Sequence, residues 1–176
     1  MTDVFLERTF DPSISEADVH RMVRDGGECM RLHQVAWQCS FLGTGGRRML
    51  CWFRAPDAES ARMSLRQVGA DVSVCWPGTV HDAADPGHAN VLVERRFEAP
   101  VRLEDVAAIE DAAAGCLETY RVTFVRSFFA RDRKRMICLY HAPDAESVRA
   151  AQREGKVPHD RVWAFRAIRP ADVARA

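Results

Sequence analysis

The hydrophobic and polar positions of the chain follow the same order in each half. Alternating apolar residues predict a strand, and apolar residues three and four positions apart then predict a helix. A second strand, a short turn, a third strand, a second helix and a fourth strand follow. This β-α-β-β-α-β order is typical of a ferredoxin-like unit. The strands are expected near 4–10, 35–41, 49–53 and 71–76, and again near 91–97, 122–128, 136–140 and 161–168.

The ends of the predicted helices carry residues that favour such ends. Ser15 is a suitable N-cap for the first helix, and the glycine pair 26–27 is expected to end it. The matching helix of the second half is expected to end at Gly115. Hairpin tips are predicted at 43–46 and at 131–134, where apolar runs are interrupted by small or charged residues.

The second half repeats the first at a constant offset. The hexapeptide Ala-Pro-Asp-Ala-Glu-Ser at 55–60 recurs letter for letter 87 residues later, at 142–147. The same offset matches many further pairs without a gap, and only beyond Arg66 is a short gap expected, which would set Asp71 beside Asp160. So many matches in one register indicate a tandem duplication. The predicted division is 1–77 and 91–170 for the two units, 78–90 for a linker and 171–176 for a tail.

The third strand of each half is apolar on both faces. Met49, Cys51 and Phe53 alternate with Leu50 and Trp52, and the second half repeats this pattern. Such a strand predicts burial on both faces, although the helices of a ferredoxin-like unit cover only one. We therefore expect an α+β protein whose two ferredoxin-like repeats pack sheet to sheet as a pseudo-symmetric α/β barrel. The chain would be a monomer with an internal pseudo-dimer, and a homodimer is the alternative.

Composition excludes several classes of protein. The 25 Lys and Arg residues balance 25 Asp and Glu residues, and 47% of the chain is hydrophobic, which argues against disorder and against a nucleic-acid partner. No apolar run approaches the roughly 18 residues of a membrane span, and the start does not resemble a secretion signal, so a cytoplasmic protein without a membrane partner is expected. None of the six cysteines forms a Cys-x-x-Cys pair, so the spacing predicts neither a zinc knuckle nor a redox dithiol.

One stretch resembles a known family. Residues 127–149, with the strand Met-Ile-Cys-Leu-Tyr followed by His-Ala-Pro, and residues 155–162 behind them, are similar to small bacterial ferredoxin-like proteins of a domain-of-unknown-function family that includes a nickel-binding protein. The resemblance covers nearly all of 91–168 and, more loosely, 4–76. It implies a ferredoxin-like fold that pairs as a dimer. It allows nickel or another divalent metal as a cofactor, and the sequence leaves the cofactor unidentified. The positions that match the family's histidines hold Thr123, Arg126 and Ala151 here.

Several residues are candidates for chemistry. His33 and Tyr120 occupy equivalent positions at the start of the second strands and are candidate catalytic groups for proton transfer. Aromatic residues that line a space between the sheets would form an apolar pocket with few polar groups. The alternative is that they simply fill a barrel. The expected ligand-binding residues are Trp37, Ser40, Arg48, Cys51, Phe124, Ser127, Arg135, Cys138 and Tyr140.

The predicted linker carries a second candidate. His81, Asp82, Asp85 and His88 offer donors for a divalent ion, but a solvated connector is the simpler interpretation, because no regular element is expected to hold them. The basic run 131–135 is similarly interpreted as a solvated hairpin tip.

The leading functional hypothesis is a protein that binds a small ligand or a nickel-type divalent metal in a cleft between the two repeats. The alternative is a cofactor-independent enzyme of isomerase, cyclase or monooxygenase type that acts on a small aromatic or polyketide-like substrate. A structural or regulatory interaction module is the third hypothesis. Because duplicated halves diverge, we expect one asymmetric site per chain.

Overall fold

The computed structural model describes residues 1–84 and 87–175, which form two compact units. The first unit contains Met1–Gly78 and the segment that begins at Arg166, and the second contains Thr79–Phe165. Two strands therefore change unit along their length. β4 (Cys75–Asp82) starts in the first unit and ends in the second, and β8 (Arg161–Ile168) runs the other way.

The first unit has the expected β-α-β-β-α-β order. Its sheet follows the strand order β4-β1-β3-β2-β8, and the pairs β1·β3, β1·β4 and β2·β3 are antiparallel. The short helix α6 (Pro170–Val173) follows β8. The other elements of this unit are β1 (Thr2–Thr9), α1 (Glu16–Leu32), β2 (Ala36–Gly43), β3 (Arg48–Ala55) and α2 (Ala58–Gln67).

The second unit repeats this arrangement with one more helix. Its sheet follows the order β8-β5-β7-β6-β4, with antiparallel β5·β7, β5·β8 and β6·β7 pairs. The α+β prediction is therefore confirmed at the level of the individual unit. The elements are β5 (Val91–Arg96), α3 (Leu103–Ala112), α4 (Ala114–Thr119), β6 (Thr123–Ala130), β7 (Arg135–His141) and α5 (Ala145–Glu154), followed by β8.

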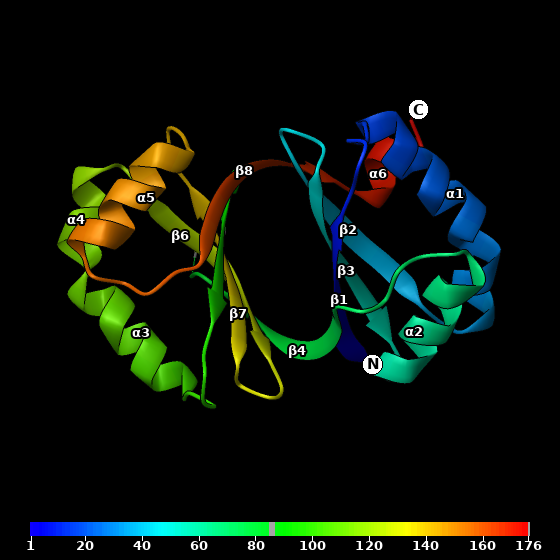
Figure 1. Cartoon of the computed structure of the whole chain (residues 1–176), viewed down its shortest axis with the longest axis horizontal. Coiled ribbons are helices and arrows are strands. Elements are labelled where there is room, and N and C mark those ends of the chain that lie inside the picture. Colours follow the sequence, from blue (N-terminus) through cyan, green and yellow to red (C-terminus); the bar gives the residue numbers. More distant parts are fainter. Residues whose placement is uncertain (85–86, 176) are drawn as a thin grey trace. The chain divides into compact units, whose positions relative to one another are not determined.

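The helices of each unit cover one face of its own sheet (Figure 1). In the first unit, Val19 of α1 and Leu65 of α2 pack against Leu6, Cys51 and Phe53 of the sheet. In the second unit the corresponding core joins helices α3 and α5 to β5 and β7. The opposite face of the first sheet carries Phe5, Trp52 and Trp76, whose rings contact one another at centroid distances of 6.4 Å (Phe5–Trp52) and 4.5 Å (Phe5–Trp76).

Contacts as well as elements recur 87 residues apart. Arg62 donates to the carbonyl of Cys75 at 2.8 Å, and Arg149 donates to that of Val162 at 2.8 Å. The Trp76 indole donates to Glu7 at 2.9 Å, just as Trp163 donates to Glu94 at 2.8 Å. The fourth strands therefore align at the offset of 87 residues. The gap that was expected to align Asp71 with Asp160 does not change the alignment of these strands.

Three predicted boundaries are wrong, each for a local reason. Helix α1 continues through glycines 26 and 27 to Leu32, because Gly26 and Met30 lie on the face that packs on the sheet. The fourth strand begins at Cys75 rather than at 71, since the Asp71 carboxylate accepts from the Ser73 amide at 2.9 Å and forms a turn. In the second unit the helix is interrupted at Ala113, so Gly115 lies inside α4 rather than at its end.

A β-bulge corrects the predicted faces of the second strand. The pairing of β2 with β3 shifts register between Trp37 and Cys39, and β6 shifts on β7 at the equivalent residues Phe124 and Arg126. A bulge adds a residue and reverses the alternation beyond it. Trp37 and Ser40, which strict alternation assigns to opposite faces, therefore share the face that the helices cover.

Candidate ligand pocket in the first unit

An arginine on β1 points toward the helices of the first unit. Val4, Leu6 and Arg8 share one face because side chains alternate along a strand. The pairing with β3 sets Leu6 opposite Cys51 and Arg8 opposite Met49, so the guanidinium lies beside the sulfur-rich middle of β3. Arg8 is half-buried. A cation is thereby held at the margin of an otherwise apolar core.

A short hydrogen-bonded chain crosses the pocket floor. The Trp37 indole nitrogen donates to Ser40 Oγ at 3.0 Å, and that hydroxyl donates to Cys51 Sγ at 3.1 Å. Ser40 and Cys51 are 1% and 5% exposed. The chain satisfies the indole N–H and fixes the position of the Trp37 ring.

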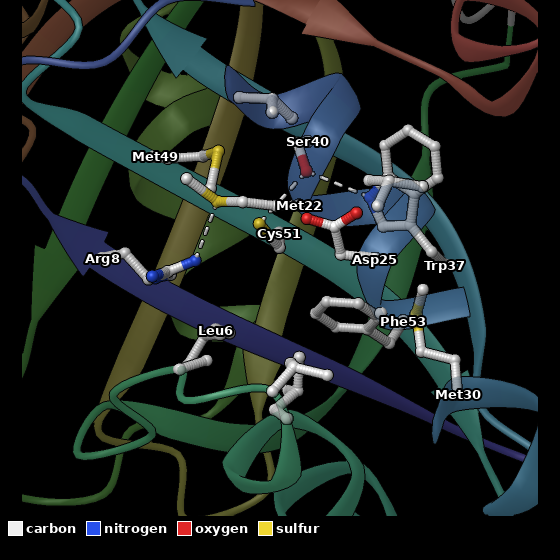
Figure 2. Close-up of a pocket in the computed structure, with 16 residues that line it drawn as sticks. Leu6, Arg8, Met22, Asp25, Met30, Trp37, Ser40, Met49, Cys51 and Phe53 are labelled. Carbon is white, nitrogen blue, oxygen red and sulfur yellow. Dashed lines mark hydrogen bonds between the residues drawn. The ribbon is translucent and has the colours of Figure 1, made fainter. Parts of the chain in front are cut away.

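These residues line a pocket of about 210 Å³ between the sheet and helices α1 and α2 (Figure 2). Its lining is mostly apolar, and the few polar groups are Arg8, Asp25, Ser40, Cys51 and the Trp37 indole. An apolar lining with a few fixed polar groups is the usual composition of a small-molecule site. The apolar walls include Leu6, Met49, Phe53, Val23, Met30 and Leu65.

Arg8 and Asp25 are the charged residues that line the pocket. Asp25 is exposed, on α1. Arg8 Nη1 donates to the Met22 sulfur at 3.4 Å (Figure 2). The Arg8 guanidinium lies 4.8 Å from the centroid of the Phe10 ring. Within residues 1–84 and 87–175, no carboxylate lies within the 4.0 Å of an ion pair with Arg8, although the charge of Arg8 helps to lower the pKa of the Asp71 carboxyl, after the hydrogen bonds from Ser73. A thioether is a weak acceptor, so this hydrogen bond of Arg8 is weaker than one to a carboxylate.

The buried thiol of the pocket is not a nucleophile at neutral pH. Burial raises the pKa of Cys51 to about 11, although the Ser40 hydrogen bond and the charge of Arg8 act in the opposite direction. Reactive cysteines have lowered pKa values, because the thiolate is the reactive form. Cys51 therefore contributes a neutral wall to the pocket.

The second unit fills the equivalent place with its own side chains. Arg95, which corresponds to Arg8, is 1% exposed and donates to the Glu110 carboxylate at 2.7 Å and to Tyr140 Oη at 3.0 Å. Tyr140 Oη in turn donates to Glu110 at 2.7 Å. Arg95 also donates to Gln152 Oε1 at 3.1 Å and to the Pro158 carbonyl at 2.6 Å. Acceptors therefore surround both terminal nitrogens of this arginine, whereas its buried Nε has no partner among the described residues.

Electrostatics support that description of the second unit. Burial alone would lower the pKa of Arg95, but Cys138 and Tyr140, once they ionise at high pH, and the Glu110 carboxylate raise that pKa above its usual range. Burial also raises the pKa of Cys138 to about 12 and raises that of Tyr140. The core therefore holds a charged guanidinium next to a neutral thiol and a neutral phenol.

Three substitutions distinguish the two units around the shared arginine. At the offset of 87, Glu110, Tyr140 and Gln152 correspond to Val23, Phe53 and Leu65, all of which line the pocket. The first unit thus keeps the arginine and replaces three of its partners by apolar residues. The result is an open pocket with an incompletely paired cation.

The structure distributes the predicted ligand-binding residues over both units. Trp37, Ser40 and Cys51 line the pocket, on the helix-covered face rather than on the opposite face, where the sequence had placed the site. Arg48 and Arg135 begin β3 and β7, and Arg48 is not among the pocket residues. In the second unit, Cys138, Tyr140 and Phe124 belong to the core under its helices, and Ser127, which is 2% exposed, is opposite Cys138 in the β6·β7 pairing.

The predicted catalytic residues lie outside this pocket. His33 caps the C-terminus of α1, and its Nε2 is 2.9 Å from Gln67 Oε1. Tyr120 caps α4 and donates to Glu154 at 2.9 Å. Their equivalence is preserved, because each follows its helix and contacts a side chain at the end of the next helix, but neither lines the pocket.

Two residues of the predicted linker cluster lie in a strand rather than in a linker. His81 and Asp82 belong to β4, where His81 Nε2 is 2.7 Å from Thr79 Oγ1 and Asp82 pairs with Arg126. Asp85 lies outside the described residues. Among residues 1–84 and 87–175, no three His, Cys, Asp or Glu side chains are grouped so that they could hold a metal ion.

Arg8 is the charged pocket residue whose role the sequence could have indicated. The signal was present, because Glu7-Arg8 matches Glu94-Arg95 at the repeat offset, and alternation from Val4 and Leu6 places the arginine on the core face. A charged residue on an apolar strand face is the informative exception to burial patterns.

Residues 92–164 match a protein-family model. The family is described as nickel responsive protein SCO4226-like. The match runs from β5 into β8, which is the second unit and less than half of the chain. The sequence resemblance is therefore supported for this part of the chain. No curated protein matches the chain.

Solved structures with similar folds share little sequence with this chain. A protein described provisionally as chlorite dismutase TA0507 matches with a TM-score of 0.53 and 12% identity over 99% of this chain and 97% of that one. A mutant chlorite dismutase from Candidatus Nitrospira defluvii, in complex with cyanide, has a TM-score of 0.50 and 11% identity over 93% of this chain and 90% of that one. Both comparisons show the fold alone. In the described residues, no helix is long and apolar enough to cross a membrane.

Proposed function

We propose that the chain is a small-ligand binding protein whose site is the pocket between the sheet and helix α1 of the first unit. The observation that carries the proposal is an apolar pocket of about 210 Å³ that contains one incompletely paired arginine. Its volume exceeds that of an apolar cavity of about 150 Å³ known to bind benzene, and lies below the roughly 300 Å³ at which drug-sized sites begin. A single-ring molecule suits it.

A titration followed by two-dimensional amide NMR tests this proposal. Benzyl alcohol, benzamide and benzoate are added separately to the full chain, and the shifted resonances are expected to cluster at residues of α1, β2 and β3 around the pocket. Val23→Phe fills the pocket and is expected to abolish the shifts. Ile109→Phe, at a position that is 41% exposed on α3, is the matched control and is expected to keep them. If none of the three probes shifts the pocket resonances, this proposal fails.

Binding of a nickel-type metal is the second candidate, and the match to the nickel responsive family supports it. The donor set does not fit a resident ion within residues 1–84 and 87–175, because no three suitable side chains are grouped there and the Cys51 and Cys138 thiols are neutral. Equilibrium dialysis of the purified chain against Ni²⁺, with metal analysis, decides the point. One retained ion per chain would favour this candidate over the organic ligand.

An enzyme of isomerase, cyclase or monooxygenase type remains a hypothesis from the sequence, and no contact described above favours it over binding. His33 and Tyr120 are partnered by Gln67 and Glu154, away from the pocket. A cleft between the repeats as the ligand site likewise remains a prediction.

We also propose that the two units arose by tandem duplication and that the aromatic face of the first sheet is covered within the chain. The recurrence of contacts at 87 residues supports the duplication. The aromatic cluster on the face opposite the helices supports the need for a cover. Sedimentation of the chain tests whether a second copy provides that cover instead.

A further inference from the structure

The two units present the same arginine in two different states. In the second unit, Arg95 forms an ion pair with Glu110 at 2.7 Å and is 1% exposed. In the first unit, Arg8 faces a pocket, and its hydrogen bond goes to a thioether. The second unit therefore shows which chemical groups pair with the terminal nitrogens of an arginine at this position of the fold.

Those groups are a carboxylate and its neighbours. Glu110 accepts hydrogen bonds from both Arg95 and Tyr140. The corresponding side chains of the first unit, Val23 and Phe53, offer neither a carboxylate nor a hydroxyl. A guanidinium recognises a carboxylate with charge-assisted hydrogen bonds, which are about twice as strong as neutral ones.

We infer that the pocket of the first unit binds a small organic carboxylate, whose carboxylate group pairs with Arg8 as Glu110 pairs with Arg95. This inference rests on the proposed function and specifies its ligand class. The apolar body of the ligand lies against Phe53, Leu65 and Val23, where the second unit places its own polar side chains. Asp25, the other charged residue of the lining, repels a carboxylate and so orients that group toward Arg8.

Benzoate and benzamide have similar shapes but differ in charge, so a comparison of their affinities isolates the effect of the charge. Isothermal titration calorimetry of the full chain is expected to show that benzoate binds about tenfold or more tightly than benzamide, the difference that a charge-assisted hydrogen bond provides. Arg8→Gln is expected to remove this preference, and Arg8→Lys to retain part of it. Arg24→Gln, at an exposed position of α1 outside the pocket lining, is the matched control and is expected to leave the preference unchanged.

A glutamate introduced into the pocket by substitution tests the same inference by changing the protein instead of the ligand. The double variant Val23→Glu, Phe53→Tyr gives Arg8 two of the partners that Arg95 has, the carboxylate and the phenol. Val23→Gln, Phe53→Tyr adds the same bulk without the charge. Benzoate is expected to bind the glutamate variant at least tenfold more weakly than the glutamine variant, whereas benzamide is expected to bind both variants equally.

The outcomes distinguish this inference from the proposed function. If benzamide and benzoate bind the unmodified chain equally, or if Arg8→Gln keeps the preference, the carboxylate inference is overturned and the pocket remains a neutral-ligand site. Equal benzoate affinity of the two double variants also overturns it. If neither compound binds, the proposed function fails as well.

Discussion

Loss of the Glu110 carboxylate should be among the most destabilising single changes in the second unit. Glu110→Val introduces the residue that the first unit has at this position, but it leaves Arg95 buried without its anion. Removing one partner of a buried ion pair costs about 3–5 kcal/mol. The Glu110 side chain is 17% exposed, and Gln152 and Pro158 still accept from Arg95, so the lower end, about 3 kcal/mol, is expected.

Thermal and urea unfolding, both followed by circular dichroism, measure this cost. For a chain of this size, about 3 kcal/mol corresponds to a fall of about 6–12 °C in Tm. The double variant Arg95→Met, Glu110→Val removes both charges and is expected to recover most of the loss. Glu104→Val, which removes a carboxylate that is 74% exposed and paired with Arg102, is the control and should cost less than about 1 kcal/mol. A Glu110→Val variant as stable as this control would refute the description of the network.

Three further predictions follow from the same contacts. Burial raises the pKa of the Cys51 thiol to about 11 and that of the Cys138 thiol to about 12, from the ordinary 9.0, so the stability that the two thiols contribute is complete below about pH 9 and is lost as the pH rises toward these values. Urea unfolding between pH 8 and pH 11 should show this decline in stability, and the double variant Cys51→Ala, Cys138→Ala should show a shallower decline. Ser40→Ala leaves the buried Trp37 indole without its acceptor and should cost about 1–3 kcal/mol in urea unfolding, and an unchanged midpoint would contradict the hydrogen-bond assignment. Asp57→Ala and Asp144→Ala each remove an N-cap that accepts from a backbone amide at 2.7 Å, and both should lower the stability by about 1 kcal/mol; clearly unequal losses would argue against equivalent caps.

The repeated pattern of apolar residues was sufficient to predict the unit fold. Alternation located most strands, and the matched hexapeptides at 55–60 and 142–147 revealed the offset that the contacts later reproduced. Local signals failed where tertiary packing overrode them. Glycines 26 and 27 have a low helix propensity, but the packing of Met30 on the sheet keeps α1 helical beyond them.

The candidate site was only partly predictable, because a bulge and a substitution pattern define it. Trp37, Ser40 and Cys51 were identified as ligand-binding residues, but strict alternation separated Trp37 from Ser40. The prediction of an asymmetric site rested on the general divergence of duplicated halves. The asymmetry seen around the arginines instead depends on Val23, Phe53 and Leu65, which in a single sequence look like ordinary core residues.

The central claim is that the first unit, and not the second, carries an open carboxylate pocket. Crystals of the full chain soaked with 4-bromobenzoate test it most directly, because the anomalous signal of bromine locates the ligand without reference to the protein model. The account predicts one bromine position per chain, under helix α1, with the carboxylate within hydrogen-bond distance of Arg8. Bromine bound beside Arg95 as well, or bound only away from Arg8, would contradict it.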